Sequence, residues 1–161
     1  MTPQPPPFVV LKIGGTSVSS ASNWRNIRDV LKARLAEGLQ PVVVHSALSG
    51  ITDRLEALLA AAAAGRHAEA LAAIAARHEA LAADLGLPLP AAVQRHLDEL
   101  GQIAAGIALV KETSDRVRAR VMATGELMAT ELGAAWLATQ GLAVEWIDAR
   151  SVVCASLRTC S

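Results

Sequence analysis

Two short apolar runs, separated by a segment with helical spacing, constrain the fold of this chain more than any other feature. The runs are Phe8–Ile13 (FVVLKI) and Pro41–His45 (PVVVH). Continuous apolar runs of this length are typical of parallel strands that are buried on both faces. The intervening segment, 22–38, carries apolar residues one helical turn apart: Trp24, Ile27, Leu31 and Leu35. A strand, a helix and a second strand in this order predict a right-handed βαβ unit.

The ends of the predicted helix carry residues that helix termini prefer. Ser22 or Asn23 can cap its first turn, and Gly38 can end it. Because the two predicted strands are parallel, their carboxyl ends lie at the same edge of the sheet, where open α/β sheets bind ligands. The loops that follow them, Gly14–Ser19 and Ser46–Thr52, are therefore expected to be neighbours.

The first of these loops has the composition of a phosphate site. Lys12 lies near the end of the strand, and Gly14, Gly15, Thr16 and Ser17 follow the strand. Glycines let backbone N–H groups approach an anion, and a lysine neutralises its charge. The loop has neither the Walker A spacing nor the Rossmann fingerprint. Taken alone, it is also typical of a tight turn that leaves a strand.

The second loop is rich in hydroxyl groups. Ser46, Ser49 and Thr52 follow the second strand, Gly50 allows a sharp turn, and a predicted helix begins at Ile51. The N–H groups of that helix terminus would face the same edge of the sheet, which suits a carboxylate or a phosphate. Loops rich in serine and glycine also simply cap helices, so both interpretations remain open here.

The rest of the chain is predicted to be mostly helical. An alanine-rich segment covers 51–110, with breaks expected at Gly65 and at 86–90 (GLPLP). A further helix is predicted over 114–140, and a third strand over 143–147 (AVEWI).

One carboxylate in the later helix is a further candidate for a binding site. Glu126 lies in ATGELMATEL, where it is either a first-turn charge favoured by the helix dipole or an inward-facing ligand for an amine. Gly125, just before it, marks either a break in the helix or a close contact.

The histidines give no metal site. His67 and His78 are three helical turns apart, too far to bind one ion, and we expect both to be exposed. His45, at the end of the second strand, is expected to be a partnered, structural residue.

Composition excludes several classes of function. Fifteen basic residues balance fifteen acidic ones, and aromatic residues make up 2% of the chain, which argues against nucleic-acid binding. Cys154 and Cys160 form neither a disulfide framework nor a zinc site, which favours a reducing, cytoplasmic compartment. We find no signal sequence and no apolar stretch of membrane-spanning length.

Four motifs, taken in order, resemble one family. LKIGGTSV, VVVHSALSGITDRL, GELMATELGAAWL and WIDAR are similar to the N-terminal part of aspartate kinases in the amino-acid kinase family. The proline-rich start and alanine-rich helices look most like the kinase end of bifunctional aspartate kinase/diaminopimelate decarboxylases. The resemblance implies a three-layer α/β fold with a parallel sheet, of which this helix-rich chain holds the N-terminal, substrate-side part. It implies an extended lead-in over 1–7, the kinase portion over 8–150 and a divergent tail over 151–161.

The same resemblance implies an activity and a set of site residues. The reaction would be ATP plus L-aspartate giving 4-phospho-L-aspartate, the first step of lysine, threonine and methionine biosynthesis, with Mg²⁺ accompanying ATP and no metal ligand identified in the protein. Lys12 would be catalytic. The phosphate would be bound by Gly14, Gly15, Thr16 and Ser17. The amino-acid substrate would be bound by Ser46, Ala47, Thr52 and Glu126, the last through the α-amino group.

Three departures from the family pattern limit this expectation. Ile13 replaces the usual phenylalanine, a tolerable apolar exchange, and His45 precedes Ser46 at a position where an apolar residue is common. Family members also continue well beyond the matched segment, through the Gly-Ser-Asp motif and the adenine-binding loops. We therefore expect the chain alone to have little kinase activity and to self-associate through uncovered surfaces. Two alternatives remain: another amino-acid kinase, acting on glutamate, carbamate or a nucleoside monophosphate, and a non-catalytic interaction module.

Overall fold

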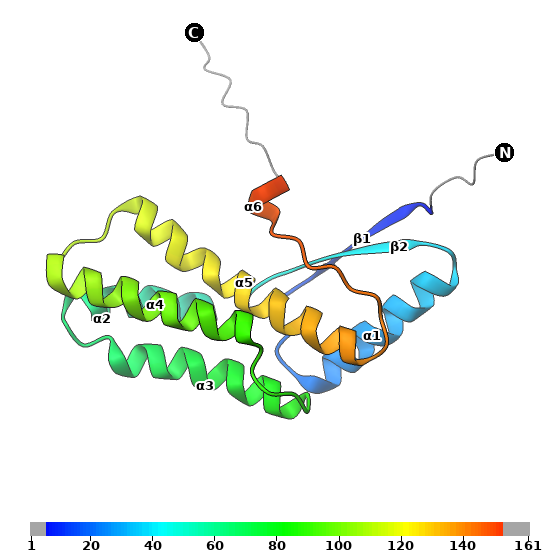
Figure 1. Cartoon of the computed structure of the whole chain (residues 1–161), viewed down its shortest axis with the longest axis horizontal. Helices are drawn as coiled ribbons and strands as arrows, with labels where there is room; N and C mark the ends of the chain where they lie inside the picture. The colour runs from blue at the N-terminus through cyan, green and yellow to red at the C-terminus, as the bar shows by residue number, and fades with distance from the viewer. Residues whose placement is uncertain (1–5, 153–161) are drawn as a thin grey trace, which may run out of the picture.

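The computed structural model describes residues 6–152 of the 161-residue chain. Figure 1 shows α2, α3, α4 and the first half of α5 gathered at one end of the molecule, with α1 and both strands at the other. The strands are β1 (Phe8–Ile13) and β2 (Gln40–His45). The helices are α1 (Ala21–Ala36), α2 (Ile51–Ala63), α3 (Ala68–Asp84), α4 (Ala91–Val110), α5 (Asp115–Thr139) and α6 (Ala149–Val152).

The βαβ unit predicted from the two apolar runs is confirmed. β1 and β2 pair in parallel, from Phe8 opposite Gln40 to Ile13 opposite His45, and α1 connects them. The cap of α1 is Ser20 rather than the expected Ser22 or Asn23, and its side chain accepts the first-turn N–H of Asn23. The chain turns after α1 through Gly38, whose φ of 77° is costly for any residue with a Cβ.

The expectation that both faces of the strands are buried is wrong. Exposure alternates along β1: Phe8 and Val10 are 68% and 66% exposed, whereas Leu11 and Ile13 pack against the core. In the described part of the chain, helix packing covers one face of the sheet, and the other face remains open. Successive side chains of a strand point to opposite faces, so one covered face gives this alternation.

The helical segments follow the predicted breaks. Gly65 and Gly86 both have positive φ, 72° and 75°, and they end α2 and α3. The helix α2 packs against α3, α4 and α5. The largest fully buried side chains include Leu48, Ile51, Leu55, Leu58, Ile74, Leu81, Leu100, Met128 and Leu132.

The third strand predicted over 143–147 is not present. This segment follows α5 without pairing to either described strand, and Trp146 and Ile147 are 36% and 58% exposed. The indole N–H of Trp146 instead donates a hydrogen bond to the Thr130 hydroxyl on α5, at 3.0 Å. An apolar run becomes a strand only when the edge of a neighbouring strand is available to it.

The expectation that both helical histidines are exposed is wrong for one of them. His78 on α3 is completely buried, and its Nδ1 lies 2.9 Å from the carbonyl oxygen of Ile74. Burial lowers the pKa of His78 below its usual value of 6.5, because the charged form is poorly solvated there. His67 is half-buried. None of the described helices combines the length and hydropathy that a bilayer crossing requires.

Candidate functional site

The two loops after the strands are neighbours, as the parallel strand order predicts. The N–H of Ser46 donates to the carbonyl oxygen of Ile13 at 3.2 Å, which extends the pairing of the strands into the second loop. Gly15 lies so close to that loop that a Cβ on it would be 2.6 Å from the carbonyl oxygen of Ala47. Only glycine fits at such an approach of two backbones.

Ser19 bridges the two loops, and sequence reasoning did not single it out. Its hydroxyl donates to the carbonyl oxygen of Gly15 at 2.6 Å and accepts the N–H of Ser49 at 2.8 Å. The guanidinium of Arg77, on α3, donates to the Ser19 carbonyl oxygen at 2.8 Å. The first loop contains several hydroxyl groups, and the sequence alone does not show which of them bonds to the second loop.

Lys12 lies on the open face of the sheet, near this edge. It pairs with Val44, and its exposed side chain shares a face with Val10. Two residues later the backbone turns, with the N–H groups of Ser17 and Val18 both donating to the carbonyl oxygen of Gly14. Only Ile13 therefore separates Lys12 from the glycine turn, and the strand partner of Lys12, Val44, is one residue from the end of β2.

The remaining residues expected in the loops differ in exposure. Thr16, Ser17 and Thr52 are exposed, and Ser46 is half-buried. Ala47 is only 4% exposed, so any contact it makes with a ligand would be through its backbone.

Glu126 is not in a first helical turn, which corrects one of the two interpretations of this residue. It lies in the middle of α5, which begins at Asp115, so the amino-terminal helix dipole does not act on it. Gly125 makes a close contact rather than a break, because a Cβ there would lie 3.1 Å from the Cβ of Ala47. This contact brings α5 against the second loop, with the exposed carboxylate of Glu126 one residue further on.

His45 is a partnered residue, as expected. It is 8% exposed, its Nδ1 lies 2.9 Å from the carbonyl oxygen of Ser46, and its ring stands edge-on to Trp24, with centroids 5.5 Å apart. Burial lowers the pKa of His45, while its hydrogen bond to Ser46 and the negative charge of Glu126 act in the opposite direction.

The described residues offer no ready metal site. Among residues 6–152, no three histidine, cysteine, aspartate or glutamate side chains come together in a group that could hold an ion. The pair Cys154 and Cys160 lies outside the described residues.

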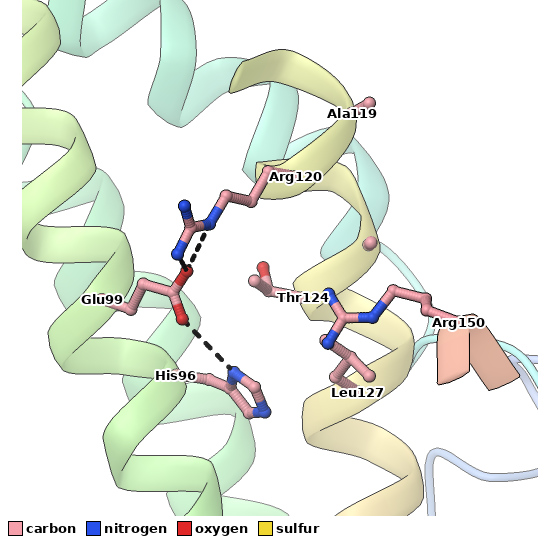
Figure 2. A pocket seen from close by; sticks show the side chains of 8 residues that line it. His96, Glu99, Ala119, Arg120, Thr124, Leu127 and Arg150 are labelled. Carbon is pink, nitrogen blue, oxygen red and sulfur yellow. Dashed lines mark hydrogen bonds and ion pairs between the residues drawn. The ribbon is translucent and has the colours of Figure 1, made fainter. Parts of the chain in front are cut away.

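A separate cavity of about 410 Å³ lies between α4, α5 and α6. Figure 2 shows His96 and Arg120 converging on Glu99, with Arg150 reaching in from α6. The Nη2 atom of Arg120 lies 2.6 Å from Oε1 of Glu99, and the Nη2 atom of Arg150 lies 2.6 Å from Oδ2 of Asp148. Because these arginines already have carboxylate partners, and none of the expected site residues lines the cavity, the two loops remain the candidate site.

Comparison with known proteins identifies the family. The model of the amino acid kinase family matches residues 7–156, and the chain therefore belongs to this family. Aspartokinase 1 of Arabidopsis thaliana, a chloroplastic protein, is 31% identical over 145 residues, which are 87% of this chain and 25% of that protein. Lysine-sensitive aspartokinase 3 of Escherichia coli is 31% identical over 148 residues, which are 91% of this chain and 32% of that protein.

A solved structure agrees with the sequence relatives. The crystal structure of E. coli aspartokinase III in complex with aspartate and ADP matches with a TM-score of 0.77 at 30% identity, over 91% of this chain and 32% of that one. The expected fold class, a helix-rich partial α/β domain with a parallel sheet, is thereby confirmed, as is the resemblance to aspartate kinases. The chain spans about a quarter to a third of the length of these relatives.

Proposed function

We propose that this chain forms the amino-acid and terminal-phosphate side of a kinase site that transfers a phosphoryl group from ATP to L-aspartate. The observation that carries the proposal is the junction of the two loops, where Gly15 meets Ala47 at the carboxyl end of the parallel strands. The product would be 4-phospho-L-aspartate, which would place the reaction at the start of lysine, threonine and methionine biosynthesis. The similarity to aspartokinases over about nine-tenths of the chain supports this choice of substrate.

The first loop is assigned to the phosphate. The ammonium group of Lys12 would stabilise the charge on the transferring phosphoryl group, and the backbone N–H groups of Gly14 and Gly15 would donate to its oxygens. The exposed hydroxyls of Thr16 and Ser17 would line the same position. These groups are of the right chemical type, since phosphoryl transfer depends mainly on positioning and on charge stabilisation.

The second loop and α5 are assigned to aspartate. Ser46, Ala47 and Thr52 would hold the amino acid through hydroxyl and backbone groups, and Glu126 would bind its α-amino group. The approach of Gly125 to Ala47 supports this assignment, because it brings the Glu126 segment to the second loop. The chemistry also fits, since an exposed carboxylate attracts an ammonium group.

Magnesium is assigned to the nucleotide rather than to the protein. The described residues near the first loop offer hydroxyls but no cluster of carboxylates, so they do not fit a protein-held ion. Mg²⁺ commonly binds through substrate phosphates with few protein ligands. We therefore treat Mg-ATP as the substrate and assign no step to a protein metal centre.

We further propose that the 161-residue polypeptide binds aspartate but does not catalyse phosphoryl transfer on its own. The open sheet face, with Phe8 68% exposed and Val44 51% exposed, leaves the lysine side of the site uncovered. Such a face also favours self-association. The kinase portion is assigned to 8–150, and a cytoplasmic location stays a prediction.

Isothermal titration with L-aspartate and L-glutamate tests the proposed site. We expect the wild-type chain to bind aspartate, to bind glutamate at least tenfold more weakly, and to lose about tenfold in aspartate affinity in Glu126→Gln. Glu69→Gln, at an exposed position in the first turn of α3, is the matched control and should bind as the wild type does. Equal binding of both amino acids would point to another amino-acid kinase, and no binding of either would favour an interaction module.

A coupled assay tests the absence of turnover. Measurable ATP-dependent phosphorylation of aspartate by the purified chain would contradict that part of the proposal. Should turnover be found, Lys12→Ala must abolish it if the lysine has the assigned role.

A further inference from the structure

Ser19 occupies a position that links the candidate phosphate loop to the candidate aspartate loop. Its one hydroxyl makes two hydrogen bonds, donating to Gly15 at 2.6 Å and accepting from Ser49 at 2.8 Å. A hydroxyl can do both because it has one proton and two lone pairs. The first bond stays within the first loop, and the second crosses to a residue thirty positions away. The Ser19 hydroxyl oxygen thus joins the two loops, in addition to the Ser46–Ile13 hydrogen bond and the close approach of Gly15 to Ala47.

Arg77 holds the same residue from the helical side. Its Nη2 donates to the Ser19 carbonyl oxygen at 2.8 Å, across 58 positions of the chain. The donor comes from α3, whose other packing partners are α2, α4 and α5. Hydrogen bonds from a charged donor are stronger than neutral ones, so this contact fixes the Ser19 peptide relative to the helices.

We propose that Ser19 and Arg77 are positioning residues of the two-loop site: the Ser19 hydroxyl sets the spacing between the loops, and Arg77 orients the peptide that carries it. The inference rests on the proposed function, because the groups being positioned are the phosphate and aspartate ligands assigned there. Misplacing a binding group by a fraction of an ångström weakens every interaction that depends on its geometry. Neither residue is expected to touch a substrate.

The amide exchange rate of Ser49, measured by NMR on the 161-residue chain, tests the bridge without any ligand. Ser19→Ala removes the acceptor of this N–H, and we expect its exchange to become about tenfold faster, the effect of losing one hydrogen bond. Ser19→Thr keeps the oxygen and should keep the wild-type rate. Ser22→Ala is the matched control, since Ser22 is exposed and bonds only near its own helix start.

Arg77 is tested in the same way. Arg77→Gln should raise the exchange rate of Ser49 by about threefold, because the bridge remains but its support is removed. Arg95→Gln, at an exposed position of α4, is the control and should leave the rate unchanged. An unchanged Ser49 rate in Ser19→Ala, or equal acceleration in Ser19→Ala and Ser19→Thr, would overturn the role of the hydroxyl. An unchanged rate in Arg77→Gln would overturn the role of Arg77.

Titration with L-aspartate then separates positioning from general stability. In Ser19→Ala we expect the dissociation constant for aspartate to rise about tenfold while the thermal midpoint stays close to that of Ser22→Ala, and Ser19→Thr should restore the affinity. Wild-type affinity in Ser19→Ala would contradict the inference and leave the proposed function intact. No aspartate binding by the wild type would instead contradict the proposed function, and the Ser49 exchange rates would still decide whether the bridge exists.

Discussion

In the helical layer formed by α2 to α5, Leu58, Ile74 and Leu100 are at most 1% exposed, whereas Phe8 and Val10 on the open face of the sheet are 68% and 66% exposed. The helices bury their apolar side chains against one another in a core that also includes Trp24, Ile27 and Leu31 of α1. The strands bury one face and leave the other uncovered. The candidate site lies at the end of the less supported region, so its geometry depends on contacts that reach it from the helices.

Helix α5 connects the two regions. Figure 1 shows it running from the helical end of the molecule to α1 and the strands. At the strand end, the ring of Trp24 packs against Trp136, with centroids 6.0 Å apart, and against His45. This junction packs α5 against α1 and the end of β2, and the largest mutational effects are expected there.

Gly133→Ala should have the largest effect on stability. A Cβ at Gly133 would overlap the ring of Trp24, so α1 and α5 would have to separate. We expect a loss of about 3 kcal/mol in the free energy of unfolding, measured by urea titration. Gly106→Ala is the matched control, because its Cβ would meet nothing within 4 Å, and helix propensity favours alanine. Similar stabilities of the two variants would show that the junction does not link the regions.

Gly15→Ala should have a smaller effect, confined to the site. The added Cβ would lie 2.6 Å from the carbonyl oxygen of Ala47 and would push the two loops apart, at a cost of about 2 kcal/mol. The neighbouring Gly14→Ala would meet nothing within 4 Å and should change the unfolding free energy little. If both substitutions proved equally harmless in urea titrations, the close approach of the loops would be refuted.

Acid should destabilise both regions through their buried histidines. Burial lowers the pKa of His78 and of His45 in the folded chain, so the unfolded chain binds more protons below its ordinary histidine pKa of 6.5. Stability should therefore fall as the pH is lowered through 6.5, and it should be fully retained above it. We expect His78→Gln to flatten this dependence in urea titrations between about pH 7.5 and about pH 5.5. A wild-type stability that rises on acidification would contradict the buried neutral state.

The smallest effect is expected from a surface ion pair in the helical region. The Nη1 atom of Arg118 on α5 lies 2.8 Å from Oε1 of Glu56 on α2, and the two side chains are 56% and 45% exposed. Exposed pairs of this kind contribute little, and Arg118→Gln should cost about 0.5 kcal/mol or less. A loss several times larger in the urea midpoint would mean that the helical layer depends on surface charge rather than on its core.

The sequence predicted the parts of the fold that depend on local pattern. The two apolar runs and the spacing of Trp24 and Ile27 were sufficient for the βαβ unit, because strand and helix periods differ. Gly65 and Gly86 marked the helix breaks, since both adopt positive φ. The neighbouring loops followed from the parallel order of the strands alone.

The parts that depend on long-range packing were not predictable from local pattern. The strand Phe8–Ile13 is almost uniformly apolar, so its sequence does not show that only one of its faces is covered. His78 stands in an alanine-rich helix whose burial is decided by α2, α4 and α5, which pack against it. The bridge made by Ser19 needs Ser49, and the third strand expected over 143–147 needed a partner edge that its own residues do not reveal.

Backbone amide shifts in NMR spectra test most directly whether the two loops form one site. L-aspartate and a non-hydrolysable analogue of Mg-ATP, which carries the terminal phosphate, are added to the wild-type chain, first separately and then together. We predict that amides in both loops, 14–19 and 46–52, shift together and that Glu126 shifts with aspartate. Shifts confined to one loop, or shifts centred on α3 and α4 with both loops unaffected, would contradict the account.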